Sequence, residues 1–330
     1  MRNVSFAGTG YHLPERIVTN DDLARLIDTS DDWIRERSGI RERRWIEPGQ
    51  TLAGLGAAAA RMAMDDAGVG PRDIDLVICA TISGDHFFPG NGVLLQRDLG
   101  LGPVAALDVR NQCTGFIYGV ATAAAFIRSE QADTALVVGA EVQSTALDLS
   151  DRGRDMAVLF GDGAGAAVLR AADEGGDVLA SALHSQGKFH DALWCEMPSC
   201  HVPGRIDGTH LAEGRHHPRM NGRLVFKHAV RRFCEAIEEV LEKGGATRDD
   251  IALVIPHQAN LRITEAVAKR FELAPQQVFS NIHKYGNTTA ASIPIALAEA
   301  AREGRLERGD LLVLVAFGSG FTWGANLIRW

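Results

Sequence analysis

Residues 106–128, ALDVRNQCTGFIYGVATAAAFIR, decide the fold, because they join a short apolar strand to an alanine-rich helix through a single cysteine. The pattern predicts a strand over 106–109 and a helix over 115–128, which places Cys113 at the amino end of that helix. There the free backbone N–H groups and the positive end of the helix dipole favour thiolate over thiol. Because most cysteines are only small buried hydrophobes, a nucleophile needs support from other loops.

Two further polar loops stand at junctions of the same kind. The loop VIPHQAN ends a strand over 251–255 and leads into a helix that begins near Asn260, so His257 follows the carboxyl end of a strand. The loop KYGNTT leads into a helix over 291–302, so Asn287 precedes the amino end of a helix. Ligand sites in α/β folds gather at these two kinds of position. Both residues are therefore candidates for the same active site as the cysteine.

The chain also carries an internal repeat. Shifting the sequence by 177 places lays GVGPRDIDLVI (68–78) on GATRDDIALVI (245–255). In each copy an amphipathic helix, over 57–67 or 231–243, is followed by a glycine turn and a buried strand, which in the first copy covers 75–80. Repetition of order and spacing indicates a duplicated α/β unit.

Composition limits the class of protein. The chain has 330 residues, 46% of them hydrophobic, a net charge of −8 and five cysteines. An acidic balance argues against general nucleic-acid binding, and no apolar run is long enough for a membrane span. An odd number of cysteines in apolar or helical contexts is typical of reduced thiols, and the amino terminus runs straight into a strand without a signal peptide. We therefore expect a cytoplasmic enzyme with no nucleic-acid or membrane partner.

Positive charge is nevertheless concentrated in two places. Several arginines crowd the stretch around Trp33, and an aromatic ring beside guanidinium groups suits a nucleotide with phosphates. A second group of basic residues shares one face of the helix after the His257 loop. Taken alone, both clusters are more often solvated surface than binding sites. The first cluster contains Arg35, Arg37, Arg41, Arg43 and Arg44, and the second contains Arg262, Lys269 and Arg270.

Seven stretches, in the same order along residues 9–330, resemble the β-ketoacyl-acyl carrier protein synthase III family of the thiolase superfamily. They are DDWI (31–34), CTGF (113–116), FGDGAG (160–165), MNGR (220–223), PHQAN (256–260), YGNT (285–288) and FTWG (321–324). The resemblance implies a thiolase-like, duplicated αβαβα layered fold. It further implies an amino-terminal half, 1–174, with Cys113, and a carboxyl-terminal half, 175–330, with His257 and Asn287.

The resemblance also implies roles for residues outside this trio. The family is homodimeric and uses coenzyme A thioesters as substrates, without a cofactor or metal. The residues that match its coenzyme A contacts are Trp33, Arg37, Arg154 and Asn260; those that match its carrier-protein docking surface are Lys227, Arg262, Lys269 and Arg270. Backbone N–H groups of Cys113 and Ser319 would form an oxyanion hole, and Phe88 would close the acyl pocket of the partner subunit.

The residue types at the site favour one chemistry within the superfamily. A thiolate takes an acyl group from a thioester, and two neutral N–H donors, His257 and Asn287, would stabilise the enolate that a malonyl thioester leaves when it loses carbon dioxide. Degradative thiolases need a second cysteine in the closing glycine loop, which here reads AFGSG (316–320). Chain-elongating synthases use two histidines. We therefore expect condensation of an acyl-coenzyme A primer with malonyl-acyl carrier protein, as in fatty-acid initiation.

Some departures from the family pattern keep two alternatives open. Arg110, Asn111 and Gln112 stand where small residues are usual, which suits a specialised ketosynthase or acyltransferase of secondary metabolism. The other alternative is a non-catalytic partner subunit, for which loss of the nucleophile is expected. The histidine-rich segment 184–217 offers Cys195, Cys200 and His201 as soft metal ligands, but the spacing matches no standard zinc pattern. We expect an irregular loop that borders the acyl pocket.

Overall fold

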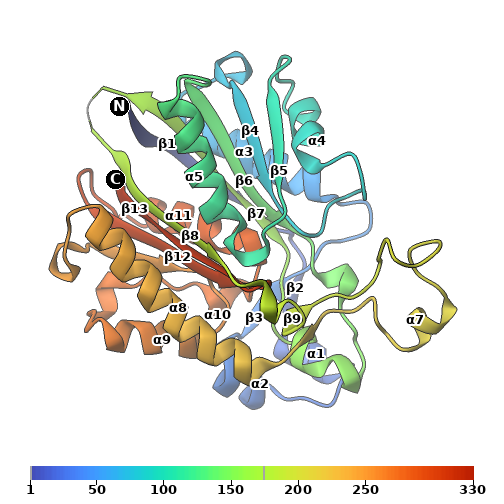
Figure 1. Ribbon diagram of the computed structural model, residues 1–330. Helices are drawn as coiled ribbons and strands as arrows, with labels where there is room; N and C mark the ends of the chain where they lie inside the picture. The colour runs from blue at the N-terminus through green and yellow to red at the C-terminus, as the bar shows by residue number, and fades with distance from the viewer. Residues whose placement is uncertain (1, 174) are drawn as a thin grey trace.

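The structure, a computed structural model, describes residues 2–173 and 175–330 and contains two main sheets (Figure 1). The first has the strand order β1-β7-β6-β4-β5, and the second has the order β11-β12-β13-β8. The strands of the first sheet are β1 (Asn3–His12), β4 (Leu76–Ala80), β5 (Ala105–Val109), β6 (Thr134–Glu141) and β7 (Gly163–Ala172). Those of the second are β8 (Asp177–Ser185), β11 (Leu253–Pro256), β12 (Leu311–Gly318) and β13 (Thr322–Arg329).

Helices cover both sheets and fill the space between them. In Figure 1, α5 (Gly115–Arg128) and α11 (Ser292–Arg302) lie between the two sheets, and each contacts strands of both. Helix α3 (Leu52–Ala67) covers the outer face of the first sheet, while α8 (Gly222–Lys243) packs on the outer face of the second and against α9 (Leu261–Arg270). This layering confirms the αβαβα fold expected from the sequence. The division of the chain at residue 174 stays a prediction.

Short elements complete the chain around this core. The remaining helices are α1 (Asn20–Ala24), α2 (Asp31–Ser38), α4 (Asn91–Asp98), α6 (Arg154–Ala157), α7 (Gly208–Ala212) and α10 (Ile282–Tyr285). Two short strand pairs are formed by β2 (Ile17–Thr19) with β3 (Glu42–Arg44) and by β9 (Leu193–Trp194) with β10 (Arg219–Met220). Over the described residues, no helix combines the length and the apolar character needed to cross a bilayer.

The central strands bring the carboxyl ends of several elements to one edge. Strand β4 runs parallel to both β5 and β6, and all of its residues are buried, as expected for a parallel strand with helices on both faces. In the second sheet β11 is parallel to β12. The turns that follow β5 and β11 carry Cys113 and His257, so each sheet contributes one of these residues from the carboxyl end of a parallel strand.

Most predicted element positions are confirmed, with shifted ends. The helix after Cys113 covers 115–128 as predicted. Two helices begin earlier than expected: α3 starts at Leu52, where Thr51 accepts a hydrogen bond from the N–H of Gly54, and α8 starts at Gly222. The second repeat's strand, predicted over 251–255, is wrong at both ends: β11 begins at Leu253 and continues to Pro256, which still pairs with Val315.

Candidate active site

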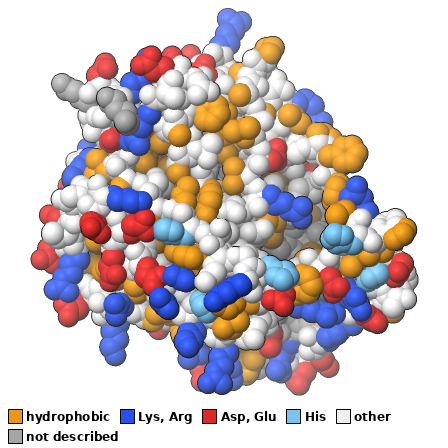
Figure 2. All heavy atoms as spheres, in the orientation of Figure 1, with side chains coloured by type: hydrophobic (Ala, Val, Ile, Leu, Met, Phe, Trp, Pro, Cys, Tyr) orange, Lys and Arg blue, Asp and Glu red, His pale blue; other side chains and the backbone are white. Residues whose placement is uncertain are grey.

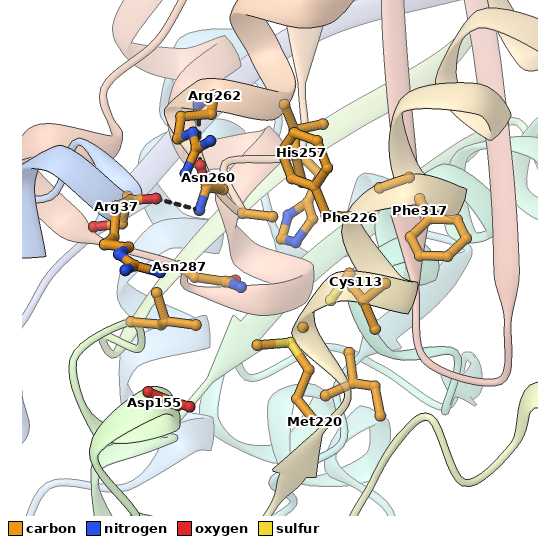
Figure 3. Close-up of a pocket in the computed structure, with 18 of the residues that line it drawn as sticks. Arg37, Cys113, Asp155, Met220, Phe226, His257, Asn260, Arg262, Asn287 and Phe317 are labelled. Carbon is orange, nitrogen blue, oxygen red and sulfur yellow. Dashed lines mark hydrogen bonds between the residues drawn. The ribbon is translucent and has the colours of Figure 1, made fainter.

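A cavity of about 580 Å³ opens where the two sheets meet, and all three residues of the predicted trio line it. Figure 3 shows the sulfur of Cys113, the imidazole of His257 and the side-chain amide of Asn287 turned toward one shared space. The rest of the lining is mostly apolar and includes Leu193, Met220, Val225, Phe226, Ala229, Phe233 and Phe317. An apolar cleft with a few convergent polar groups is the usual form of a small-molecule site.

Cys113 occupies a tight turn between β5 and α5. The turn Gln112–Thr114 precedes the helix, and the thiol is buried. Burial, with a smaller contribution from the Glu141 carboxylate, raises the pKa of the Cys113 thiol to about 12. This raised pKa contradicts the expected thiolate at neutral pH, because burial disfavours the charged form.

Gly318, at the end of β12, lies against this cysteine. A methyl group added to Gly318 would stand 2.9 Å from the Cβ of Cys113 and 3.4 Å from its sulfur. Only a residue without a side chain fits such an approach. Gly318 therefore limits the space around the sulfur of Cys113.

His257 is neutral and is held by one hydroxyl. Burial lowers the pKa of His257 to about 3, and the side chain is 1% exposed. Its Nδ1 lies 2.6 Å from the Oγ of Ser292, while its Nε2 is buried without a hydrogen-bond partner and faces the cavity. The backbone N–H of Gln258 also donates to Ser292, over 3.4 Å. Because a serine hydroxyl both donates and accepts, Ser292 supports either tautomer of the imidazole.

The amide of Asn287 is oriented by its own loop. Its Oδ1 accepts the backbone N–H of Thr289 at 2.9 Å, so the NH₂ group is the end left to face the cavity. The backbone of Asn287 is fixed as well, since it donates to the carbonyl of Leu159 and accepts from the N–H of Gly161. In the tautomer whose Nε2 carries the hydrogen, neutral His257 and Asn287 offer two uncharged N–H donors beside the Cys113 sulfur, and such donors stabilise a developing oxyanion.

The residues expected to contact coenzyme A gather at the mouth of the cavity. Two guanidinium groups lie over the Trp33 ring, with Arg37 at 5.3 Å and Arg154 at 4.7 Å from its centroid. Asn260, which also lines the cavity, is engaged in the fold: its Nδ2 donates to the carbonyl of Arg37 at 2.9 Å, and its Oδ1 accepts the N–H of Arg262 at 3.0 Å. Asn260 therefore ties α9 to α2.

The residues expected to dock a carrier protein lie exposed on α8 and α9. Lys227, Arg262 and Lys269 are exposed, and Arg270 is also exposed but lies 3.6 Å from the Glu238 carboxylate. Figure 2 shows basic side chains along the lower part of the molecule, where Figure 1 places α8 and α9, with acidic side chains among them. The surface is thus mixed in charge, and Arg270 is partly neutralised.

The remaining predicted positions, Ser319 and Phe88, are not among the residues that line the cavity. Ser319 donates its hydroxyl hydrogen to the carbonyl of Leu193, which keeps its side chain away from Cys113. Phe88 is 77% exposed on the loop between β4 and α4, and Arg205 lies 3.9 Å over the ring of neighbouring Phe87. The chain therefore presents Phe88 outward, away from the cavity that its own residues line.

The histidine-rich segment is more regular than expected. Strand β9 within the segment pairs with β10 just beyond its carboxyl end, and the segment also carries α7. Leu193 of β9 and Met220 of β10 border the cavity. Figure 2 shows several histidines on the side of the molecule that carries this segment. The thiol of Cys195 donates to the carbonyls of Met197 and His216. Among residues 2–173 and 175–330, no three metal-binding side chains of the His, Cys, Asp or Glu type come together.

Comparison with known proteins agrees with this geometry. Residues 107–187 match the family model described as 3-Oxoacyl-[acyl-carrier-protein (ACP)] synthase III, and residues 241–330 match the model for its C terminal part. A β-ketoacyl-[acyl-carrier-protein] synthase III from Symbiobacterium thermophilum is 46% identical over 330 residues, which cover 100% of this chain and 99% of the relative.

Solved structures show the same likeness in three dimensions. The 3-oxoacyl-[acyl-carrier-protein] synthase III from Aquifex aeolicus VF5 is 42% identical, with a TM-score of 0.91 over 99% of this chain and 100% of the other. A priming β-ketosynthase from the R1128 polyketide biosynthetic pathway is 32% identical, with a TM-score of 0.90 over 99% and 96% of the two chains. The chain therefore belongs to the 3-oxoacyl-acyl carrier protein synthase III family.

Proposed function

We propose that the chain is an acyltransferase that condenses an acyl-coenzyme A primer with malonyl-acyl carrier protein, giving β-ketoacyl-acyl carrier protein, carbon dioxide and free coenzyme A. The observation that carries this proposal is the convergence of a buried thiol with two uncharged N–H donors, from His257 and Asn287, in one apolar cavity. Retention of all three groups disfavours the alternative of a non-catalytic partner subunit.

The first half-reaction transfers the primer to the enzyme. The sulfur of Cys113 attacks the thioester carbonyl carbon, the bond from that carbon to the coenzyme A sulfur breaks, and the thiol proton ends on the departing coenzyme A. The backbone N–H groups of Cys113 and Ser319 are proposed to hold the carbonyl oxygen meanwhile.

The second half-reaction forms the new carbon–carbon bond. Malonyl-acyl carrier protein loses its carboxylate as carbon dioxide, and the electron pair left behind forms an enolate on the thioester oxygen. The Nε2–H of His257 and the amide of Asn287 would donate to that oxygen, and a charged carboxylate in either place would repel it. The enolate carbon then attacks the acyl-cysteine, and the released thiolate takes a proton from water. The reaction requires no cofactor.

Surface features support the proposed contacts with coenzyme A and with the acyl carrier protein. The Trp33 ring and the guanidinium groups of Arg37 and Arg154 offer a stacking face and positive charge for the nucleotide end of coenzyme A. The exposed cations Lys227, Arg262 and Lys269 suit an acidic carrier protein, with Arg270 as a weaker member because of its ion pair.

We further propose that the enzyme acts as a cytoplasmic homodimer in which Phe88 closes the partner's acyl pocket. Two adjacent aromatic rings on the loop between β4 and α4 are exposed, 63% for Phe87 and 77% for Phe88. Large apolar groups presented together are typical of interfaces. A specialised primer fits the same scheme, since a relative at 32% identity is a priming ketosynthase of a polyketide pathway.

Intact-protein mass spectrometry with a panel of acyl-coenzyme A compounds tests the proposal and the primer choice together. We expect one acyl mass per chain, located on Cys113 and absent from Cys113→Ala. An adduct on Cys195 or Cys200, the exposed cysteines, would contradict the assignment of the nucleophile. Absence of any adduct across straight, branched and polar primers would contradict the acyltransferase function itself.

A further inference from the structure

The loop that carries His257 is fastened to a neighbouring segment through the next residue, Gln258. Gln258 is 1% exposed, and its Oε1 accepts two hydrogen bonds, from the hydroxyl of Ser280 at 2.8 Å and from the backbone N–H of Asn281 at 3.1 Å. Its Nε2 donates to the carbonyl of Pro256 at 2.6 Å. Buried amide groups with all these partners hold a loop in one position.

Asn281 also forms a hydrogen bond with the buried carboxylate of Glu299 on α11. Its Nδ2 donates to Oε2 of Glu299 at 2.8 Å, and the other carboxylate oxygen accepts from the ammonium of Lys284 at 2.7 Å and from the hydroxyl of Tyr285 at 3.1 Å. Glu299 is 7% exposed. A buried carboxylate is stable only with partners of this kind. Here three donors converge on it, two from α10 and one from the residue that precedes this helix.

Glu299 therefore fastens both ends of the loop that carries Asn287. Helix α10 ends just before this loop and α11 begins just after it, and the carboxylate joins the two. Between them φ is +65° at Gly286, which a glycine adopts freely, and +51° at Thr289, where a branched side chain makes the conformation strained. Thr289 is the residue whose N–H orients the Asn287 amide. A strained conformation of this kind persists only where the surrounding structure holds it.

We propose that Glu299 is a positioning residue for the decarboxylating half-reaction, acting through α10 on Asn287 and through Asn281 and Gln258 on the His257 loop. This inference rests on the proposed function. The two donors must both reach one enolate oxygen, and a displacement of about 1 Å costs up to roughly 10²-fold in rate. Cys113 lies in the turn after β5, which belongs to the first sheet. The rate of acyl transfer to Cys113 should therefore not depend on Glu299.

Glu299→Gln tests this inference with little change in volume. The glutamine oxygen still accepts from Asn281, but its NH₂ group then faces the donors of Lys284 and Tyr285. Glu303→Gln is the matched control, because Glu303 lies 3.9 Å from the same ammonium group but its side chain is 46% exposed. Tyr285→Phe, which removes one hydrogen bond of the set, is the milder variant if Glu299→Gln folds poorly.

The measurements are the two single-turnover half-reactions and backbone hydrogen exchange. We expect Glu299→Gln to lower the condensation rate of the pre-acylated enzyme by about 10- to 100-fold, with acylation of Cys113 within about twofold and an unchanged KM for malonyl-acyl carrier protein. Tyr285→Phe should show a smaller loss in the same step, and Glu303→Gln should match the wild type. Amides of residues 284–289 should exchange faster in Glu299→Gln alone.

Two results would overturn the inference: condensation by Glu299→Gln at the rate of Glu303→Gln, or an equal loss in both half-reactions. Failure of the proposed function is separately visible, because the wild-type chain would then not be acylated at all. In that case the exchange comparison still decides whether Glu299 holds the Asn287 loop, since unchanged exchange in Glu299→Gln would exclude it.

Discussion

The substitution Gly318→Ala isolates the contact between β12 and the reactive sulfur. The added methyl carbon would lie 2.9 Å from the Cβ, 3.1 Å from the backbone nitrogen and 3.4 Å from the sulfur of Cys113. Carbon atoms in contact normally stand about 3.5–4.0 Å apart, so the cysteine turn or the strand must move by several tenths of an ångström. Gly318 does not have a positive φ, so the cost is steric and not conformational.

Overpacking of this kind costs about 1–3 kcal/mol, and if it falls on the transition state it lowers the rate by roughly five- to 150-fold. We expect a loss in this range in the rate of acyl transfer to Cys113, followed by intact mass on a time scale of seconds. Gly102→Ala is the control, because a methyl group there meets nothing within 4 Å. Wild-type acylation by a folded Gly318→Ala, or an equal loss in Gly102→Ala, would refute the reasoning.

Three further outcomes follow from the site. Asn287→Ala should acylate normally but condense about 10²-fold more slowly, the usual cost of one oxyanion donor, and an equal loss in both single-turnover steps would show that its role is not confined to the enolate. Charge reversal at Arg262 and Lys269 should raise the KM for malonyl-acyl carrier protein and weaken its salt dependence while acylation is kept, whereas reversal at exposed Arg72 should do neither; an unchanged KM would exclude this surface. Because burial lowers the pKa of His257 to about 3, the condensation rate should show no acid limb near pH 6.5. The unfolded chain takes up this proton below its ordinary pKa of about 6.5, so the contribution of neutral His257 to stability is complete above that pH and is lost as the pH falls toward 3; a melting temperature that falls no more steeply in the wild type than in His257→Asn would contradict this.

The meeting of the trio was predicted from local patterns, whereas the layered fold was predicted from the family resemblance. Cys113, His257 and Asn287 stand at junctions between strands or turns and helices, which is where ligand sites gather in α/β folds. The family resemblance supplied their proposed roles. Helix ends were less predictable. Glycines at positions 54 and 56 are unfavourable in helices, so the pattern did not predict the first turn of α3, whose start depends on the cap from Thr51.

The electrostatics of the site could not be predicted from the sequence. The helix terminus was expected to lower the pKa of Cys113, but depth of burial depends on packing from both sheets and raises the pKa instead. Ser292 and Glu299 were missed for a related reason. Each is an ordinary polar residue in an apolar helix, and its partners, the His257 ring and the donors of α10, become visible only in three dimensions.

The assembly of the site from two sheets has a consequence for how activity returns after denaturation. Cys113 is carried by a turn of the first sheet, whereas His257 belongs to the second, and the sulfur meets Gly318 only when the sheets dock. Local helices such as α5 and α8 form early, but contacts between residues far apart in sequence form late. Recovery of acyl transfer during refolding should therefore lag behind recovery of helical circular dichroism. The time at which activity returns then reports when the two sheets dock.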